Sequence, residues 1–477
     1  PRIRIRMRPM ANWGHAPCEV TWGSNHLRYV GGAQTLRLTT DAPVSHIREE
    51  RTFRLEEPIA MYLGSDEGFD ADLGVTTERM LRETTAYWQG WVRTLSVPLE
   101  WQEAVIRSAI TLKLCAHEET GAIVAALTTS IPEHSESGRN WDYRYCWLRD
   151  AYYVVQALNR LGAADLLENY LVYLRNLTDQ ARGGHIQPVY GVGLEPSLTE
   201  HFAEALPGYR GMGPVRVGNQ AHEHLQHDVY GQIILSAVQA FFDERLLRPA
   251  GVDDFRALEP IGERAFELHD KPDASLWEFR GREAVHTYSS VMCWAACDRL
   301  GNAAAKLGLM ERADLWNGRA ATIRAAIEAR AFNAEEGRYA ATFGGAELDA
   351  SLLQMVDVRF VEPDNPKMAA TLAAVESGLR RGPYMLRYAL PDDFGEPKTA
   401  FNICTFWLIE VLHLSGRTDE ARALFEDMLS RRTAAGLLSE DITLDGQELW
   451  GNYPQTYSLV GLINCANMLS RPWSTVR

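Results

Sequence analysis

Two glutamates in this sequence stand in surroundings that suit acid and base chemistry. Glu278 lies between Trp277 and Phe279, and a carboxyl group enclosed by two rings would lose hydration, which disfavours its charged form. This setting suits a proton donor. A glutamate shortly before a helix, here one expected to begin near His286, could equally be explained by its favourable interaction with the helix dipole.

Glu440 precedes an apolar helix, and the segment 451–458 that follows it carries aromatic and amide side chains. A carboxylate in such a loop could hold and activate a water molecule. A solvated loop glutamate is the other interpretation, because most glutamates are exposed. Taken singly, neither glutamate can therefore be assigned to catalysis.

A third cluster, residues 140–150, has the composition of a sugar-binding site. Tyr143 and Trp147 offer ring faces that pack on the C–H faces of a sugar, and Arg149 and Asp150 offer charged groups that hold hydroxyls. An aspartate before an apolar helix can also serve only as an N-cap, with the neighbouring arginine as its ion-pair partner.

The elements that must position these clusters change type along the chain. Residues 1–75 predict strands, with strict alternation over residues 2–8 and a hairpin signal at Gly31 and Gly32. From about Thr76 the pattern becomes helical, with apolar residues such as Val105 and Ala109 on one face. We therefore expect a β-domain at 1–75, a helical linker at 76–97 and a helical domain at 98–477.

The helical part is predicted to consist of antiparallel pairs. Three apolar helices, at 151–162, 291–301 and 401–416, each end at a glycine that can adopt the left-handed helix-stop conformation. Successive pairs could form an open solenoid or a closed ring. Long loops at 135–149, 183–218, 382–398 and 436–454 favour a ring with a walled pocket, because simple solenoid turns are shorter.

Composition excludes several classes of function. The chain has 477 residues, a formal net charge of -15 and no apolar run long enough to span a membrane. The negative charge disfavours a nucleic-acid partner. Seven scattered cysteines suggest reduced core thiols, and Cys293 and Cys297 lack the further ligands that a metal would need. Without an apolar leader at Pro1 we expect an incomplete N-terminus and a cytoplasmic location.

Several segments taken together resemble glycoside hydrolase family 15, the family of glucoamylases, glucodextranases and trehalases. The match includes Trp141-Asp142-Tyr143-Arg144 and Leu276-Trp277-Glu278, and the matching segments occur in family order across residues 98–470. They are residues 120–126, 128–133, 139–150, 213–219, 228–231, 276–278, 291–294, 387–388, 404–407 and 451–455. The resemblance implies a mainly α fold, an (α/α)6 barrel preceded by a partial antiparallel β-sandwich.

The resemblance also implies roles for individual residues. It makes Glu278 the general acid and Glu440 the general base, with Tyr143 near the base and its water. Four residues match positions that hold the nonreducing glucose: Trp147, Arg149, Asp150 and Arg387. Trp277 matches a wall of the same pocket.

This sequence departs from the family pattern at a few positions. It has Ser290 in place of a usual lysine, Lys398 and Thr399 in place of a frequent acidic residue and glycine, and Leu459 in place of a frequent histidine. Both glutamates are retained. We expect these departures to bear on the site of the leaving group, and therefore on the substrate.

The predicted function is an inverting exo-acting α-glucoside hydrolase that releases β-glucose from nonreducing ends, with no cofactor and no metal. Inversion requires about 6.5 to 9.5 Å between the two carboxyl groups, to leave room for water. The first alternative is a trehalase that uses the same site, and the second is a noncatalytic carbohydrate-binding protein. A phosphorylase would need a cationic cluster where Glu440 stands.

Overall fold

The computed structural model describes residues 1–32, 34–69, 72–181 and 184–476, so residue 183, the predicted start of one long loop, lies outside the described residues. The chain forms two compact units. One contains residues 1–94 and 202–215, and the other contains residues 95–201 and 216–477.

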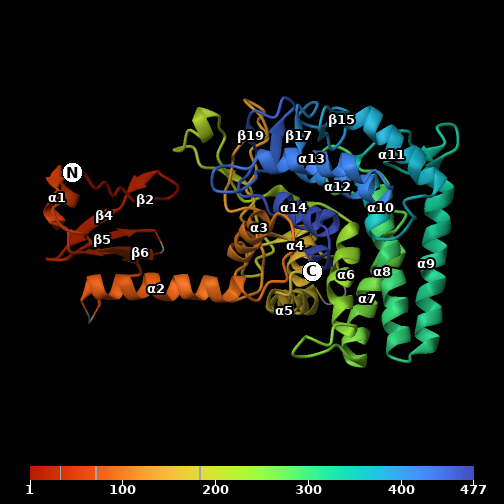
Figure 1. Ribbon diagram of the computed structural model, residues 1–477, viewed down its shortest axis with the longest axis horizontal. Helices are drawn as coiled ribbons and strands as arrows, with labels where there is room; N and C mark the ends of the chain where they lie inside the picture. The colour runs from red at the N-terminus through yellow and green to blue at the C-terminus, as the bar shows by residue number, and fades with distance from the viewer. Residues whose placement is uncertain (33, 70–71, 182–183, 477) are drawn as a thin grey trace. The chain divides into compact units, whose positions relative to one another are not determined.

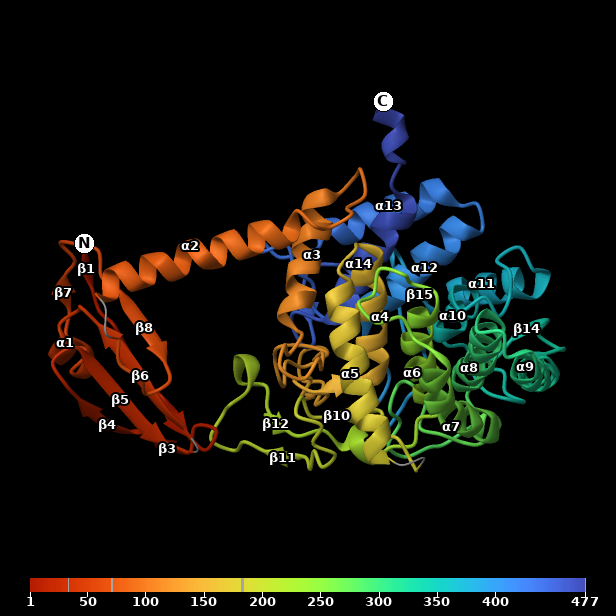
Figure 2. The same cartoon turned by 90° about the horizontal axis from the view of Figure 1, so that it is seen from below.

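The first unit is built on a four-stranded antiparallel sheet, β4 (Glu19–Trp22), β5 (His26–Gly31), β6 (Gln34–Thr40) and β8 (Met61–Gly64), in that order (Figure 2). Gly31 pairs with Gln34, so the predicted hairpin is present. A short helix, α1 (Val44–Arg48), and a long helix, α2 (Leu73–Val92), complete the unit together with the short strands β1 (Arg2–Ile3), β2 (Met10–Ala11), β3 (Ala16–Pro17) and β7 (Phe53–Arg54).

The alternating segment 2–8 is a strand only at β1, because its partner β7 is two residues long. Ile5 and Met7 nevertheless face the core of Leu27, Tyr29 and Leu38. The alternation therefore predicted which side chains face inward but not how far the ladder extends. The helical pattern begins at Leu73, where the Asp72 side chain accepts a hydrogen bond from the Val75 amide at 3.0 Å.

The second unit is an (α/α)6 barrel, as predicted. Its outer helices are α3 (Gln102–Leu114), α5 (Ala164–Ala181), α7 (Val252–Leu268), α9 (Met310–Arg330), α11 (Pro366–Leu379) and α13 (Thr418–Ser430). Its inner helices are α4 (Leu148–Arg160), α6 (Asp228–Val238), α8 (Thr287–Lys306), α10 (Gln354–Asp357), α12 (Asn402–Leu414) and α14 (Thr456–Leu469). The inner ring closes where α14 contacts both α12 and α4.

In all three predicted pairs, α4–α5, α8–α9 and α12–α13, a short turn joins the inner helix to the outer helix that follows it. Gly162 and Gly416, at φ 92° and 84°, end α4 and α12 as expected. Gly301 does not end α8, which continues to Lys306 and turns at Gly308 with φ 75°. Gly301 instead allows α8 and α9 to pack closely side by side (Figure 1), since a Cβ there would lie 2.2 Å from the Asn317 Oδ1 atom.

The turns η3 (Gln239–Phe241) and η5 (Trp473–Val476) follow α6 and α14. The connections from outer to inner helices are the long ones, and they contain the turn η1 (Tyr209–Gly211) and the remaining short elements. These are the strands β9 (Cys146–Trp147), β10 (Val189–Tyr190), β11 (His201–Phe202), β12 (Arg216–Val217), β13 (Phe332–Asn333), β14 (Arg338–Tyr339), β15 (Arg380–Arg381), β16 (Tyr384–Met385), β17 (Thr399–Phe401), β18 (Asp441–Thr443) and β19 (Leu449–Trp450), and the turns η2 (Gln220–Glu223) and η4 (Ala350–Leu353). Because every such loop leads into an inner helix, all six inner N-termini lie at the loop end of the barrel.

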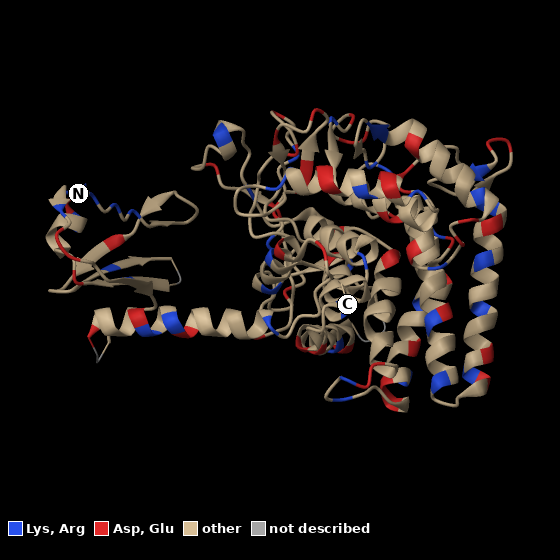
Figure 3. Cartoon of the chain, viewed as in Figure 1, with Lys and Arg blue, Asp and Glu red and all other residues tan. Residues whose placement is uncertain are grey.

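Three properties of the described residues bear on the excluded functions. Basic residues (blue) and acidic residues (red) are interspersed along the ribbon of the outer helix α9 (Figure 3). All seven cysteines are free thiols. Within the described ranges, no helix has the length and apolarity needed to cross a membrane, and His, Cys, Asp and Glu side chains form no group of three or more suited to a metal ion.

Candidate active site

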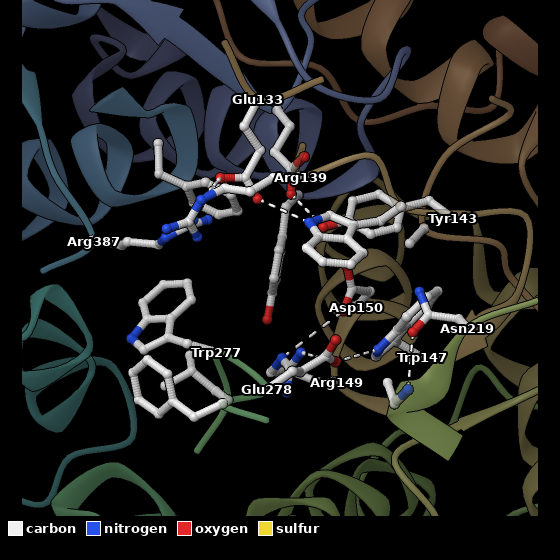
Figure 4. A pocket seen from close by; sticks show the side chains of 18 of the residues that line it. Glu133, Arg139, Tyr143, Trp147, Arg149, Asp150, Asn219, Trp277, Glu278 and Arg387 are labelled. Carbon is white, nitrogen blue, oxygen red and sulfur yellow. Dashed lines mark hydrogen bonds and ion pairs between the residues drawn. The ribbon is translucent and has the colours of Figure 1, made fainter. Parts of the chain in front are cut away.

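A pocket lies at the loop end of the barrel, and all eight candidate residues line it. Tyr143 and Trp147 lie on one side of the pocket, and Trp277 lies on the opposite side (Figure 4). The remaining candidates in its wall are Arg149, Asp150, Glu278, Arg387 and Glu440. Residues that are far apart in sequence thus share one cavity.

Glu278 is in the loop between α7 and α8, where its backbone has a left-handed conformation with φ 62°. Such a conformation costs a residue with a side chain about 1 to 3 kcal/mol and often occurs at functional sites. The Oε1 atom of Glu278 accepts a hydrogen bond from the Trp147 indole at 2.5 Å and a longer one from Gln226 Nε2 at 3.4 Å. The Arg149 guanidinium lies 3.6 Å from the same oxygen.

The expected dehydration of Glu278 by its sequence neighbours is incomplete, since 22% of its side chain remains exposed. Trp277 donates its indole N–H to Asp349 at 2.7 Å and packs edge-on against Phe401. Phe279 packs against Tyr388. The two flanking rings therefore build the pocket wall, and the contacts to the carboxylate come from Trp147, Gln226 and Arg149. The predicted helix after this loop begins at Thr287, close to His286 as expected.

Glu440 is buried immediately before β18. Its Oε1 atom accepts a hydrogen bond from the Tyr143 hydroxyl at 2.6 Å, and its Oε2 atom has no hydrogen-bond partner among the described residues. Burial, followed by the negative charge of Glu133, raises the pKa of Glu440 to about 8. Gly451, at φ 75°, packs so closely that a Cβ there would lie 2.7 Å from the Glu440 Cβ.

The rings of Tyr143 and Trp147 contact each other edge to face, with centroids 5.3 Å apart. Trp147 belongs to β9, which pairs with β10 through the Trp147–Val189 register. One short segment therefore holds both carboxylates, Glu440 through Tyr143 and Glu278 through Trp147. These contacts bridge 297 and 131 residues of sequence, respectively.

Arg149 and Asp150 occupy the first turn of α4. Arg149 donates to Gln226 Oε1 at 2.8 Å and to Asp228 Oδ2 at 3.4 Å. The N-cap position belongs to Trp147, so the N-cap explanation for Asp150 is wrong. Burial raises the pKa of Asp150 to about 7, although the nearby Arg149 charge opposes this shift.

Arg387 is held by an acidic residue that had no assigned role. Its guanidinium donates to Glu133 Oε2 at 2.5 Å, and the Trp141 indole donates to the other oxygen of Glu133 at 3.0 Å. Glu133 and Trp141 line the pocket as well. Both residues lie within segments that resemble the family, 128–133 and 139–150. This position in the sequence was the only indication that they belong to the site.

Further loop residues that sequence reasoning missed also line the pocket. Two guanidinium groups lie near the ring of Trp141: Arg280, which lines the pocket, is 4.7 Å from the ring centre, and Arg216 is 5.0 Å from it. Both arginines pair with Glu200. His224 lines the same cavity.

The expectation that the departures from the family pattern bear on the leaving-group site stays a prediction. Ser290, Lys398, Thr399 and Leu459 are all absent from the residues that line the described pocket. Ser290, in α8, donates to the carbonyl of His269 at the end of α7, and Leu459 is buried in α14. Thr399 alone approaches the catalytic region, where its hydroxyl donates to Asp441 Oδ1 at 3.1 Å. Ser290 and Leu459 thus lie within inner helices, whereas Lys398 is exposed in the loop before β17 and Thr399 is the first residue of that strand.

Solved structures support the fold assignment. The chain aligns with a bacterial glucoamylase in complex with acarbose at a TM-score of 0.69 and 16% identity, covering 93% of this chain and 73% of that one. It also aligns with the glucoamylase of Saccharomycopsis fibuligera at a TM-score of 0.58 and 12% identity, covering 77% and 94%. At such low identity these similarities show the fold alone.

Sequence relatives are more similar. The chain is 33% identical over 390 residues to a protein named trehalase from Thermoplasma volcanium, covering 82% of this chain and 62% of the relative. It is 34% identical over 388 residues to a trehalase of Mycolicibacterium smegmatis, covering 80% and 58%. The chain thus spans about three fifths of the length of these curated relatives. The family model of glycosyl hydrolases family 15 matches residues 101–467, and the chain belongs to that family.

Proposed function

We propose that the chain contains the catalytic site of an inverting α-glucoside hydrolase, with Glu278 as general acid and Glu440 as general base. The observation that carries this proposal is the arrangement of Tyr143 and Trp147, two contacting rings that each donate a hydrogen bond to one of the carboxylates. Family membership supports the same reaction class.

The chemistry follows from the two different settings. Protonated Glu278 gives its proton to the glycosidic oxygen as the bond from that oxygen to C1 breaks. A water molecule at the unpartnered Oε2 atom of Glu440 attacks C1 from the opposite face and gives its proton to that carboxylate. The product is β-glucose, and the leaving group departs as an alcohol.

The glucose that is cleaved is proposed to lie against Arg149, Asp150 and Arg387, which are buried in the pocket wall. Hydrogen bonds from these groups strengthen as the ring flattens toward an oxocarbenium ion. Because Arg149 and Asp150 belong to the first turn of an inner helix, a sugar that reaches them lies at the barrel core. This depth favours attack on a terminal residue.

For the substrate we propose α,α-trehalose, the alternative of the sequence-based prediction. Relatives with 33% and 34% identity over most of this chain are named trehalase, whereas the glucoamylase structures share only its fold. The other candidate substrate is the nonreducing end of an α-glucan, which the sequence analysis favoured, and it must be compared with trehalose.

The test is to incubate the protein with trehalose, maltose, isomaltose, dextran and starch, and to follow glucose release and its anomers by NMR. Inverting hydrolysis of trehalose initially releases one β-glucose and one α-glucose for each bond broken, because only one of the two anomeric centres is attacked. Faster release from starch or maltose would support the glucoamylase-like reading. Release from none would support a carbohydrate-binding protein, and glucose 1-phosphate formed only with phosphate would indicate a phosphorylase.

A further inference from the structure

His224 is an uncommitted side chain in the wall of the pocket. It directly follows the turn η2, and its amide donates to the Ala221 carbonyl. Both ring nitrogens are buried, and neither has a hydrogen-bond partner among the described residues. A neutral imidazole offers one donor and one acceptor, and buried polar groups are normally paired. The side chain is therefore equipped for a partner that the chain itself does not provide.

The surroundings of His224 identify the part of the pocket that it faces. The charged groups that act on it are Glu278, Arg280, Glu223 and Asp393. Burial, the strongest influence, lowers the pKa of His224, so that the ring is neutral near neutral pH. A neutral ring keeps the acceptor nitrogen that an imidazolium would lack.

These neighbours place His224 beside Glu278, the proposed donor to the glycosidic oxygen. A side chain beside that donor is within reach of the alcohol that departs with its proton. The Arg280 amide donates to Asp393 at 2.7 Å, and its guanidinium lies over the Trp141 ring. These residues come from loops, whereas Arg149 and Asp150 come from the helix beneath.

We propose that His224 determines leaving-group specificity by exchanging hydrogen bonds with the hydroxyls of a leaving sugar. This inference rests on the proposed function and specifies the substrate further. A sugar has adjacent hydroxyls that can satisfy both ring nitrogens, whereas an apolar or monatomic leaving group would leave them unpaired in a buried setting. The pocket is thus built for a saccharide on both sides of the bond that is broken.

The test compares two substrates that share the cleaved glucose but differ in the leaving group. These are the disaccharide that the wild-type protein hydrolyses fastest, with trehalose as the first choice, and α-glucosyl fluoride, whose leaving group has no hydroxyl. His224→Phe removes both nitrogens and keeps a ring. We expect kcat/KM for the disaccharide to fall about 10- to 100-fold, and kcat/KM for the fluoride to change by less than about twofold.

His224→Gln is the matched control, because its amide retains one donor and one acceptor and should restore most of the disaccharide activity. His224→Ala replaces the Phe variant if the larger ring disturbs folding, as judged by thermal melting. Equal losses on both substrates, or no loss on either, would overturn the proposal. If the wild-type protein hydrolyses neither substrate, the proposed function fails, and that result is distinct from every outcome that concerns His224.

Discussion

The two carboxylates of the pocket, Glu278 and Glu440, differ in exposure and in the number of donor groups that contact them. Glu278 has a left-handed backbone, is partly exposed and is approached by three donor groups at one oxygen. Glu440 is buried, receives one hydrogen bond from Tyr143, and has a second oxygen without a partner. Two residues of the same type are thus placed in opposite surroundings.

This difference corresponds to what the two proposed roles require. An acid must regain a proton after each turnover, and partial exposure gives it access to solvent. A base must hold one water molecule in line with C1, which an unpartnered oxygen beside the close backbone of Gly451 can do. Because both residues are glutamates, only their surroundings can separate the two proposed roles.

The largest expected effect comes from removing each carboxylate in turn. Glu278→Gln and Glu440→Gln should each lower kcat for the disaccharide by about 10²- to 10⁴-fold, the usual contribution of acid or base catalysis. With α-glucosyl fluoride the two variants should separate, because fluoride departs without protonation. Glu278→Gln should then retain much of its activity, and Glu440→Gln should not.

Steady-state kinetics with both substrates checks this expectation, with circular dichroism to show that each variant is folded. Full activity of Glu440→Gln on the fluoride would contradict its role as base. An equal loss of fluoride hydrolysis in both variants would remove the functional distinction between the two sides.

An intermediate effect is expected from the two rings that hold the carboxylates. Tyr143→Phe removes the one hydroxyl that donates to the Glu440 carboxylate among the described residues while keeping the ring, and Trp147→Phe removes the closest donor to Glu278. A hydrogen bond to a charged group contributes about 1.5 to 3 kcal/mol, so each variant should lose about 10- to 100-fold in kcat. Tyr143→Phe should affect both substrates alike, and Trp147→Phe should affect the disaccharide more.

The same pair of substrates provides the measurement for these variants. A Tyr143→Phe variant that hydrolyses the fluoride at the wild-type rate would show that this hydroxyl does not support the base.

The smallest expected effect is a shift in pH dependence. Glu440 acts as a base only when ionised, so kcat/KM should fall as the pH drops through its raised pKa. Glu133→Gln removes the neighbouring negative charge that raises this pKa and also releases Arg387, whose positive charge lowers it. Both changes move the acidic limb of the profile to lower pH.

A profile of kcat/KM against pH for the wild-type and Glu133→Gln proteins tests this shift, with Glu136→Gln in an exposed nearby loop as a control for charge alone. A limb that stays in place or moves to higher pH would show that Glu133 does not act on the base.

The local patterns of the sequence predicted the elements better than the contacts between them. Apolar spacing and the glycines correctly predicted that the first helix of two hairpins ends at Gly162 and at Gly416. It misplaced the end of α8, because Gly301 serves the packing of α9, which lies outside any local window. The sequence pattern also left open whether Asp150 is an N-cap, because it did not define the first residue of α4. The structure places that residue at Leu148.

The family-like motifs predicted the eight residues that gather in one pocket, but not the residues that support them. The contact between Arg387 and Glu133 bridges 254 residues and exists only because the ring closes. His224 has no motif that marks it, and its unpaired nitrogens become visible only in three dimensions. Pairing across a closed ring depends on tertiary geometry that no short spacing encodes.

The segment from Tyr143 to Trp147 has a consequence for how such a protein can change over time. Each carboxylate accepts a hydrogen bond from a ring of this segment, and the two residues that carry these rings are four positions apart. A substitution in this segment would therefore disturb the surroundings of both carboxylates at once, whereas a substitution of His224 removes no described hydrogen bond to either of them.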